Sequence, residues 1–248
     1  MSVDDPRDVE GLLAAGRVVA DTLQALQAAV APGVSTGGLD ELAADCLRRA
    51  GARSGPILTY GYPGSICISV DEEVVHGVPG ARVLREAQLV TLDVAAELNG
   101  YHADAAVTVP VGTVSPAASA LVDATAASLA AGIGAAVPGA TLRDIGRAVE
   151  ESATAHGFRV FRTLTGHGIG RAMHEEPTVY NWPAPSATTV LNEGLVFTIE
   201  PMLGAGGAGL CIARDGWTVR TADRSLSAHA EHTIIVGAHD PIVVTERR

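Results

Sequence analysis

The segment LDVAAELNGYHADAAVT, residues 92–108, decides the fold because it combines strand-like alternation with a hairpin turn. Asn99-Gly100 at its centre is the dipeptide most typical of a two-residue type I′ turn. This turn predicts an antiparallel hairpin in which Leu98 faces Tyr101. Side chains alternate between the two faces of a strand, so one face is expected to be core. That face carries Leu92, Val94, Ala96, Leu98, Ala103, Ala105 and Val107.

The opposite face of the predicted hairpin carries two carboxylates, Asp93 and Asp104. In this register Asp104 faces Ala95 and Asp93 faces Ala106, so the two acids are diagonal neighbours. Like charges this close repel each other unless a positive group lies between them. Taken alone, the pattern also fits a solvated polar face, which is the usual position of acids in strands. Other parts of the chain must decide between these readings.

Composition excludes several functional classes. The chain has 248 residues, of which 47% are hydrophobic and 18% charged, as in a globular protein. A net charge of −11 argues against general nucleic-acid binding. All 17 cationic residues are arginines, which excludes a Schiff-base lysine, a P-loop lysine and a Ser-Lys dyad. No apolar run reads as long enough to span a membrane, so no membrane partner is expected.

The N-terminal sequence and the cysteines predict a cytoplasmic protein. The first ten residues lack the apolar core of a signal peptide. The three cysteines, Cys46, Cys67 and Cys211, are an odd number without C-x-x-C spacing. This usage fits a reducing compartment better than a disulfide framework.

Helix signals recur in the two halves of the chain. Cap and proline signals predict a long helix from Pro6 to about residue 32 and another from about Pro116 to residue 138. Shorter helices follow at about 38–50 and 141–157, and each half then becomes strand-rich, at about 64–112 and 160–245. We therefore expect one α+β domain, 1–248, with halves of about 1–112 and 113–248. A chance likeness between Ala-rich helices is the alternative.

Four further stretches carry residues suited to chemistry. His76 lies in VVHGVPG, His167 and His174 in TGHGIGRAMHEEP, Glu200 in GLVFTIEPM and Glu231 in DRSLSAHAEHTIIV. Each signal is weak alone: GHGIG lacks G-x-G-x-x-G spacing, and HEEP is not the H-E-x-x-H of zinc proteases. No G-x-S-x-G elbow is present, which argues against a serine hydrolase.

Together with the hairpin, these motifs resemble those of the methionine aminopeptidases. The matching stretches are HGVP, LDVAAELNGYHADAAVT, GHGIGRAMHEEP, FTIEPM and DRSLSAHAEHT. The resemblance covers essentially the whole chain and is strongest to the short bacterial type I form. It implies the pita-bread fold, in which two pseudo-symmetric halves form a curved antiparallel sheet covered by helices.

The resemblance implies a five-ligand dinuclear metal site. Asp104 and Glu231 would bridge two divalent cations, Asp93 would hold one of them, and His167 and Glu200 would complete the other. Four carboxylates balance the charge of two divalent cations. An oxygen-rich set with one imidazole suits Mn, Fe or Co at least as well as Zn.

The same resemblance implies the reaction. A hydroxide that bridges the two metals would attack the first peptide bond, with Glu200 as the proton shuttle. His174 would polarise the scissile carbonyl, and His76 would contact the substrate backbone. The substrates would be N-terminal methionines of peptides and nascent proteins with a small second residue, met near the ribosome. The protein is expected to be a monomer.

The pocket for the methionine side chain matches the family only in part. Tyr62, Cys67 and Trp217 match the family's lining. Thr59 stands where an aromatic residue is common, and Met173 stands where Phe is usual. These two differences concern the tightness of the pocket and not the reaction.

Three other functions remain open from the sequence. The first is another pita-bread peptidase acting on Xaa-Pro bonds, although such enzymes normally carry a separate N-terminal domain for which this chain has no room. The second is a catalytically inactive binding protein of the same fold, although such proteins usually lose metal ligands. The third is an unrelated structural protein, for which the set of motifs would be a coincidence.

Overall fold

The predicted hairpin is the centre of the first half of the molecule. The computed structural model describes residues 1–3 and 5–246. Strands β4 (Gln88–Leu98) and β5 (Tyr101–Val111) pair along their whole length, with Asp104 opposite Ala95 and Asp93 opposite Ala106, as predicted. Asn99 and Gly100 have φ of 52° and 83°, the positive values that a type I′ turn requires.

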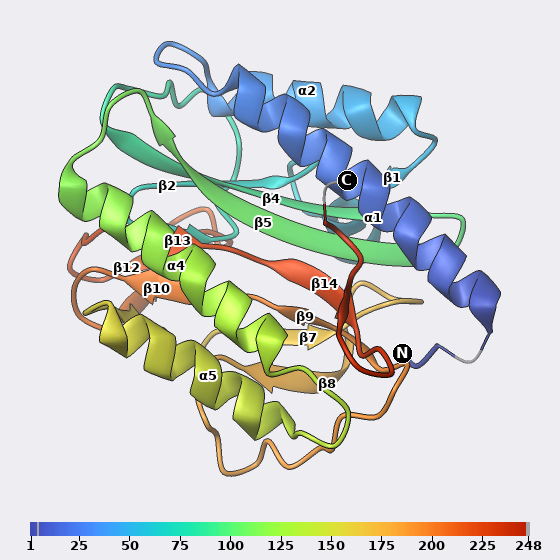
Figure 1. Ribbon diagram of the computed structural model, residues 1–248. Coiled ribbons are helices and arrows are strands. Elements are labelled where there is room, and N and C mark those ends of the chain that lie inside the picture. The colour runs from blue at the N-terminus through green and yellow to red at the C-terminus, as the bar shows by residue number, and fades with distance from the viewer. Residues whose placement is uncertain (4, 247–248) are drawn as a thin grey trace.

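Two helices cover the apolar face of the hairpin, α1 (Pro6–Ala29) and α2 (Thr36–Arg49) (Figure 1). Their buried side chains form one core with the inward residues of β4 and β5. Helix α2 begins two residues before the expected start because Ser35 is its cap, accepting a hydrogen bond from the Gly38 N–H. Strands β1 (Arg53–Ser54) and β2 (Cys67–Val70) complete this sheet on β4, and the short helix α3 (Gly55–Tyr60) follows β1.

The second half repeats the plan with α4 (Pro116–Gly134) and α5 (Leu142–Ala155). These helices lie over the strands of the second half (Figure 1) and share a second core with them. The five-stranded sheet has the order β15 (Ile242–Val243), β14 (His232–Ile235), β9 (Val196–Ile199), β7 (Thr165–Gly168) and β8 (Glu175–Tyr180).

Two small sheets complete the described part of the chain. One consists of β13 (Ser227–His229), β10 (Met202–Gly204) and β6 (Arg159–Val160). The other consists of β11 (Leu210–Ile212), β12 (Val219–Thr221) and β3 (Glu73–Val75), and so joins segments from both halves.

Equivalent backbone hydrogen bonds recur in the two halves. The Gly33 N–H donates to the Leu84 carbonyl, and the Gly139 N–H donates to the Leu191 carbonyl, each at 2.9 Å. The glycines that flank the second helix of each half all have positive φ: Gly33, Gly51, Gly139 and Gly157. Pseudo-symmetry is thus visible in the backbone, and the exact boundary near residue 112 stays a prediction.

The hairpin meets the second half through the residues around Asp104. The Glu231 N–H donates to the Ala106 carbonyl at 2.9 Å. The Thr233 hydroxyl accepts from the Asp104 N–H at 2.9 Å and donates to the Asp104 carbonyl at 2.8 Å. This contact places acids from distant parts of the sequence at the junction of the halves.

Helix α4 has the length and apolarity to cross a membrane, which the sequence reading underestimated. Its buried face, which includes Leu121 and Leu129, belongs to the second core. Burial in that core accounts for part of the apolar composition of α4, since 39% of its apolar stretch is buried.

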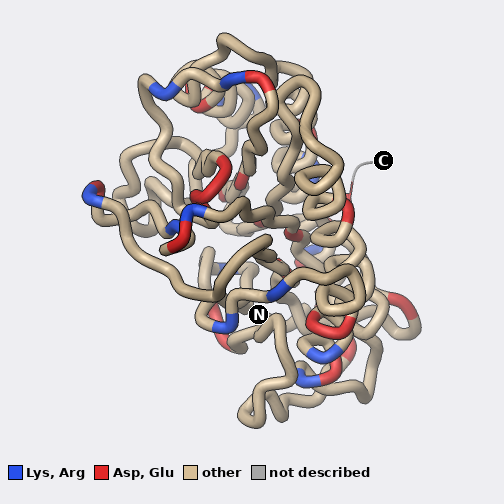
Figure 2. Tube along the Cα trace, turned by 90° about the vertical axis from the view of Figure 1, so that its left-hand side faces the viewer, with Lys and Arg blue, Asp and Glu red and all other residues tan. Residues whose placement is uncertain are grey.

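Charged residues are distributed along the whole of the described chain. In the view of Figure 2 the Arg segments are spread along the trace, and several lie beside acidic segments. Such mixing forms no continuous basic face in this view, in keeping with the net charge of −11. Cys46, Cys67 and Cys211 are all free thiols.

Candidate active site

A cavity of about 730 Å³ lies between the two halves and contains most of the residues singled out in the sequence. Asp93 of β4 and Asp104 of β5 reach it from the first half, and His167 of β7 reaches it from the second. The predicted residues that line it are Asp93, Asp104, His167, Glu200, Glu231, His76, His174, Tyr62, Cys67, Met173 and Trp217. Only Thr59 of the predicted set is not among the lining residues.

Four of the acids that line this cavity, Asp93, Asp104, Glu200 and Glu231, lie close together. Asp104, Glu200 and Glu231 are 4%, 8% and 3% exposed. Burial raises the pKa of Asp93, Glu200 and Glu231 well above that of an ordinary carboxyl, and the neighbouring carboxylates raise it further. Burial also raises the pKa of Asp104 to about 7. The cluster therefore holds its negative charge at a cost in free energy while no cation is near.

The donor atoms fit divalent cations. Ligand atoms of Asp104, His167 and Glu231 lie within 4.8 Å of one another, and so do those of Glu200, His229 and Glu231. No arginine is among the described residues that line the cavity. Asp104 Oδ1 and Glu231 Oε1 are buried without a hydrogen-bond partner. Buried carboxylate oxygens without donors are free to bind hard metal ions.

His167 is oriented as a metal ligand. Its Nδ1–H donates to the Gly168 carbonyl at 2.9 Å, which leaves Nε2 with a free lone pair. Burial lowers the pKa of His167 to about 3, so the ring is neutral, as ligation requires. Nε2 lies 3.5 Å from Glu200 Oε1.

Thr198, which the sequence reading missed, links two of the expected ligands. Its hydroxyl donates to Glu200 Oε1 at 2.7 Å and accepts from the His167 N–H at 3.1 Å. The Asn181 amide donates to the Glu200 carbonyl at 3.0 Å. Thr198 is fully buried. Its alternation with Glu200 in FTIEP was the available signal, but β-branched residues are common in any strand.

His229 also belongs to the site and was given no role from the sequence. Its Nε2 lies 3.7 Å from Glu231 Oε2 and 4.0 Å from Glu200 Oε2. Both ring nitrogens are buried without a hydrogen-bond partner, and burial lowers the pKa of His229 to about 3. Residues two apart in a strand share a face, so the position of His229 two residues before Glu231 was the signal that could have found it.

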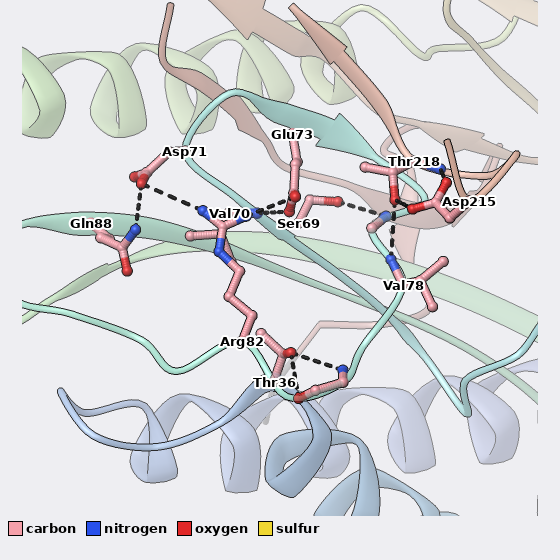
Figure 3. A network of polar contacts seen from close by, with 12 residues as sticks. Thr36, Ser69, Val70, Asp71, Glu73, Val78, Arg82, Gln88, Asp215 and Thr218 are labelled. Carbon is pink, nitrogen blue, oxygen red and sulfur yellow. Dashed lines mark hydrogen bonds and ion pairs between the residues drawn. The ribbon is translucent and has the colours of Figure 1, made fainter. Parts of the chain in front are cut away.

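The backbone around His76 is held on both sides. His76 itself has a φ of 56°, unusual for a non-glycine residue. The Gly77 N–H donates to the Ser69 hydroxyl at 3.0 Å, and the Tyr62 hydroxyl donates to the Gly77 carbonyl at 2.7 Å. The Val78 N–H donates to the Thr218 hydroxyl at 3.3 Å (Figure 3). These hydrogen bonds hold the backbone beside His76 and so fix the position from which its imidazole reaches the cavity.

The same network reaches Trp217, a wall of the expected methionine pocket. Asp215 Oδ1 accepts from the N–H groups of Trp217 and Thr218, each at 2.9 Å. Asp215 Oδ2 accepts from the Thr218 hydroxyl at 2.6 Å (Figure 3). One buried threonine thus connects the His76 segment to the Trp217 loop.

The four residues Tyr62, Cys67, Met173 and Trp217, which were expected to form the apolar pocket, all line the cavity. The Tyr62 and Trp217 rings pack edge to face with centroids 5.2 Å apart. Cys67 and Met173 are 5% and 8% exposed. Gly55 lies against Met173, because a Cβ at Gly55 would be 3.2 Å from the Met173 sulfur.

Thr59, which was expected in the methionine pocket, is not among the described residues that line the cavity. Thr59 is exposed on α3, whereas Pro56 and Tyr60 of the same helix line the cavity. Residues four apart share a helix face, while the residue beside Tyr60 points about 100° away. The neighbouring aromatic residue, Tyr60, lines the cavity, and its hydroxyl lies 2.8 Å from His174 Nδ1.

Comparisons with known proteins agree with this geometry. Residues 10–238 match the model of metallopeptidase family M24. The methionine aminopeptidase of Escherichia coli (strain K12) is 40% identical over 100% of this chain and 95% of its own length. Methionine aminopeptidase 1 of Mycobacterium tuberculosis is 44% identical over 96% of this chain and 92% of its own length.

Solved structures give the same result. Methionine aminopeptidase from Thermotoga maritima superposes with a TM-score of 0.96 at 33% identity, covering all of both chains. Prolidase from Pyrococcus furiosus superposes at 0.80 with 19% identity, covering 99% of this chain and 66% of the prolidase, which shows a shared fold. The pita-bread fold expected from the sequence is confirmed. The chain belongs to metallopeptidase family M24, whose members bind divalent metal.

Proposed function

We propose that the protein removes the N-terminal methionine from peptides and nascent proteins whose second residue is small. The observation that carries this proposal is a single cavity with a buried acid–histidine cluster beside an apolar pocket. The cluster suits hydrolysis, and the pocket suits an unbranched thioether side chain. Whole-chain similarity to methionine aminopeptidases supports the same activity.

Asp93, Asp104, His167, Glu200 and Glu231 would hold the metal. Two divalent cations are proposed because they would balance four carboxylate charges, and the donor set suits Co, Mn, Fe or Zn. When bound, the cations would neutralise the acids and lower the pKa of water enough for attack at neutral pH.

Side chains of the protein would carry out proton transfer, polarisation of the carbonyl and binding of the substrate. Glu200 takes a proton from the attacking water and returns it to the amine that leaves as the C–N bond breaks. Its hydrogen bond from Thr198 holds Oε1 in one orientation. His174 donates an N–H to the scissile carbonyl oxygen, and His76 contacts the substrate backbone. The pocket walls, Tyr62, Cys67, Met173 and Trp217, hold the methionine side chain.

The other readings receive less support. The prolidase superposition is at 19% identity and leaves a third of that longer chain unmatched. An inactive binding protein has no need of a complete acid–histidine set, and all five expected ligands line the cavity. A monomer in the cytoplasm, acting near the ribosome and independent of membranes, is the setting that we propose.

Peptide hydrolysis tests this function directly. Metal-depleted protein is assayed on Met-Ala-Ser after addition of Mn, Co, Fe or Zn, with an Xaa-Pro peptide in parallel. We expect metal-dependent release of free methionine and little cleavage of the Xaa-Pro peptide. Full activity without metal, or preference for the Xaa-Pro peptide, contradicts the proposal.

A further inference from the structure

Tyr60 and His174 form a hydrogen-bonded pair at the cavity wall. The Tyr60 hydroxyl lies 2.8 Å from His174 Nδ1, and the two rings meet edge to face with centroids 5.5 Å apart. Both residues line the cavity. They come from α3 in the first half and from the loop before β8 in the second, so only the tertiary structure brings them together.

The direction of this hydrogen bond decides what His174 can do. A neutral imidazole carries one N–H, so one nitrogen donates and the other accepts. If the Tyr60 O–H donates to Nδ1, the proton of His174 is on Nε2. In the reverse case Nε2 has a bare lone pair, which would repel a carbonyl oxygen. Among the described residues, no hydrogen bond engages Nε2.

We propose that Tyr60 is a positioning residue whose hydroxyl donates to His174 Nδ1 and thereby presents Nε2–H to the scissile carbonyl oxygen. The proposal rests on the function proposed above, because that reaction needs a donor at His174. In this proposal the Tyr60 hydroxyl determines which ring nitrogen of His174 carries the proton.

The surroundings of the pair show why His174 needs such a partner. The His174 side chain is exposed. Its ring also contacts the ring of His167, with centroids 3.9 Å apart and planes tilted by 37°. That contact restrains one face of the ring but does not choose which nitrogen carries the proton. A hydrogen-bond donor at Nδ1 both restrains the ring and places the proton of His174 on Nε2.

Helix α3 is a firm support for the donor. Ser54 caps it by accepting from the Ile57 N–H, and the Ser54 hydroxyl donates to the Ser65 carbonyl at 2.7 Å. Gly61 ends the helix in the left-handed conformation with φ of 63°. Tyr60 is therefore the last residue of a helix anchored at both ends.

The test compares Tyr60→Phe with Tyr180→Phe in the metal-loaded enzyme. Both changes remove one hydroxyl, and Tyr180 does not line the cavity. Tyr60 is 51% exposed, so the variant should fold. We expect kcat for Met-Ala-Ser to fall about fivefold to tenfold in Tyr60→Phe, the effect of one hydrogen bond, with KM changed less than about twofold. Tyr180→Phe should match the wild type.

A second readout is the ¹⁵N spectrum of the His174 ring in the zinc-loaded protein. In the wild type, Nε2 should show the shift of a protonated nitrogen and Nδ1 that of an acceptor, and Tyr60→Phe should show a mixture. Protonated Nδ1 in the wild type overturns the proposal, as does an unchanged kcat or an effect on KM alone. If the wild type does not release methionine, the proposed function fails, while the spectrum still reports whether Tyr60 sets the tautomer.

Discussion

The guanidinium carbon of Arg171 lies 3.8 Å from the ring centroid of Tyr101, directly over the turn side of the central hairpin. Its Nη2 also lies 2.7 Å from Asp8 of α1 and 2.8 Å from the Tyr101 hydroxyl. Arg171 thus fastens the loop that carries Met173 and His174 to the other half of the molecule. Glu175 Oε1 braces the same loop by accepting from the N–H groups of Arg171 and Ala172, each at 2.7 Å.

Replacing Arg171 by Ala should loosen this loop more than it destabilises the protein. The side chain is 54% exposed, so we expect a loss of about 1 kcal/mol in the free energy of unfolding. Because His174 follows three residues later, kcat for Met-Ala-Ser should fall severalfold. Arg171→Lys is the matched control for charge, and it should recover little since an ammonium lacks the planar fork. Equal activity of the wild type, Arg171→Ala and Arg171→Lys would show that the contacts of Arg171 do not position this loop for the reaction.

Asp104→Asn should lower both metal content and activity. A neutral amide cannot bridge two cations as a carboxylate does, and the cluster loses one of its four negative charges. We expect fewer metal ions per chain by elemental analysis and a kcat reduced by at least about a hundredfold. Unchanged stoichiometry with unchanged kcat would remove Asp104 from the ligand set.

The metal-free protein should lose stability as pH rises from about 5 to 8. Unfolded carboxyls titrate near pH 4, whereas the folded-state pKa of Asp104 is about 7. The folded state therefore binds more protons between these values, and the free energy of unfolding declines with rising pH. The contribution of Asp104 is complete below about pH 4 and is lost as pH rises through 7. Melting temperatures of metal-depleted protein at pH 5, 6, 7 and 8 measure this decline.

Two controls separate this effect from general titration. Manganese added at pH 7.5 should restore the melting temperature, because a bound cation stabilises the ionised acids. Asp104→Asn should show a shallower decline, since its side chain does not titrate. A melting temperature that rises steadily from pH 5 to 8 without metal would contradict the raised pKa values.

Met173→Phe should sharpen the preference for methionine at the first position. Met173 is buried, lines the cavity and is proposed as a wall of the methionine pocket, and a flexible thioether adapts to differently shaped side chains. A rigid ring should therefore raise the kcat/KM ratio for Met-Ala-Ser over Leu-Ala-Ser and norleucine-Ala-Ser. An apolar pocket distinguishes two side chains that differ by one methylene by about 1–3 kcal/mol, and this sets the size of the change expected in these ratios. Ratios that do not change on substitution, at constant metal content, would exclude Met173 from the pocket wall.

Thr198→Val should impair the proton shuttle while leaving the fold intact. The change is nearly isosteric in a fully buried site but removes the donor to Glu200 Oε1 and the acceptor for the His167 N–H. We expect a loss of about 1–3 kcal/mol in stability from the unsatisfied N–H and a lower kcat. Thr198→Ser keeps the hydroxyl and should retain most activity. Equal kcat for the Val and Ser variants would show that the hydroxyl has no part in the reaction.

Local sequence was sufficient for the hairpin and for the acids that it carries. Asn99-Gly100 specifies a type I′ turn, and a two-residue turn leaves only one register for the strands that leave it. Asp93 and Asp104 were therefore placed on one face by counting alone. The helix starts at Pro6 and Pro116 were predicted in the same way, and the start at Leu142 was predicted to within one residue, because caps act within a few residues.

The site as a whole could be anticipated only because its motifs resemble a family. Periodicity did not show that Glu200 and Glu231 meet Asp93 and Asp104, since these two pairs lie in distant parts of the sequence. Their meeting depends on the backbone pairing of Glu231 with Ala106 between the two halves. Local patterns carry no information about such pairing.

Tertiary structure alone decided which neighbours complete the site. Thr198, His229 and Tyr60 are ordinary in their local sequence, and their roles arise from distances to groups in other strands and loops. Thr59 and Tyr60 are adjacent in the chain and both exposed, yet only Tyr60 lines the cavity and reaches His174, because the orientation of α3 on the sheet determines which side chain points to the cavity. The sequence by itself determined the turn, the register and the types of ligand, since short-range sterics and hydrogen bonds govern them. Packing of the two halves determined the cavity, since its burial and its close contacts exist only after residues from both halves share one space.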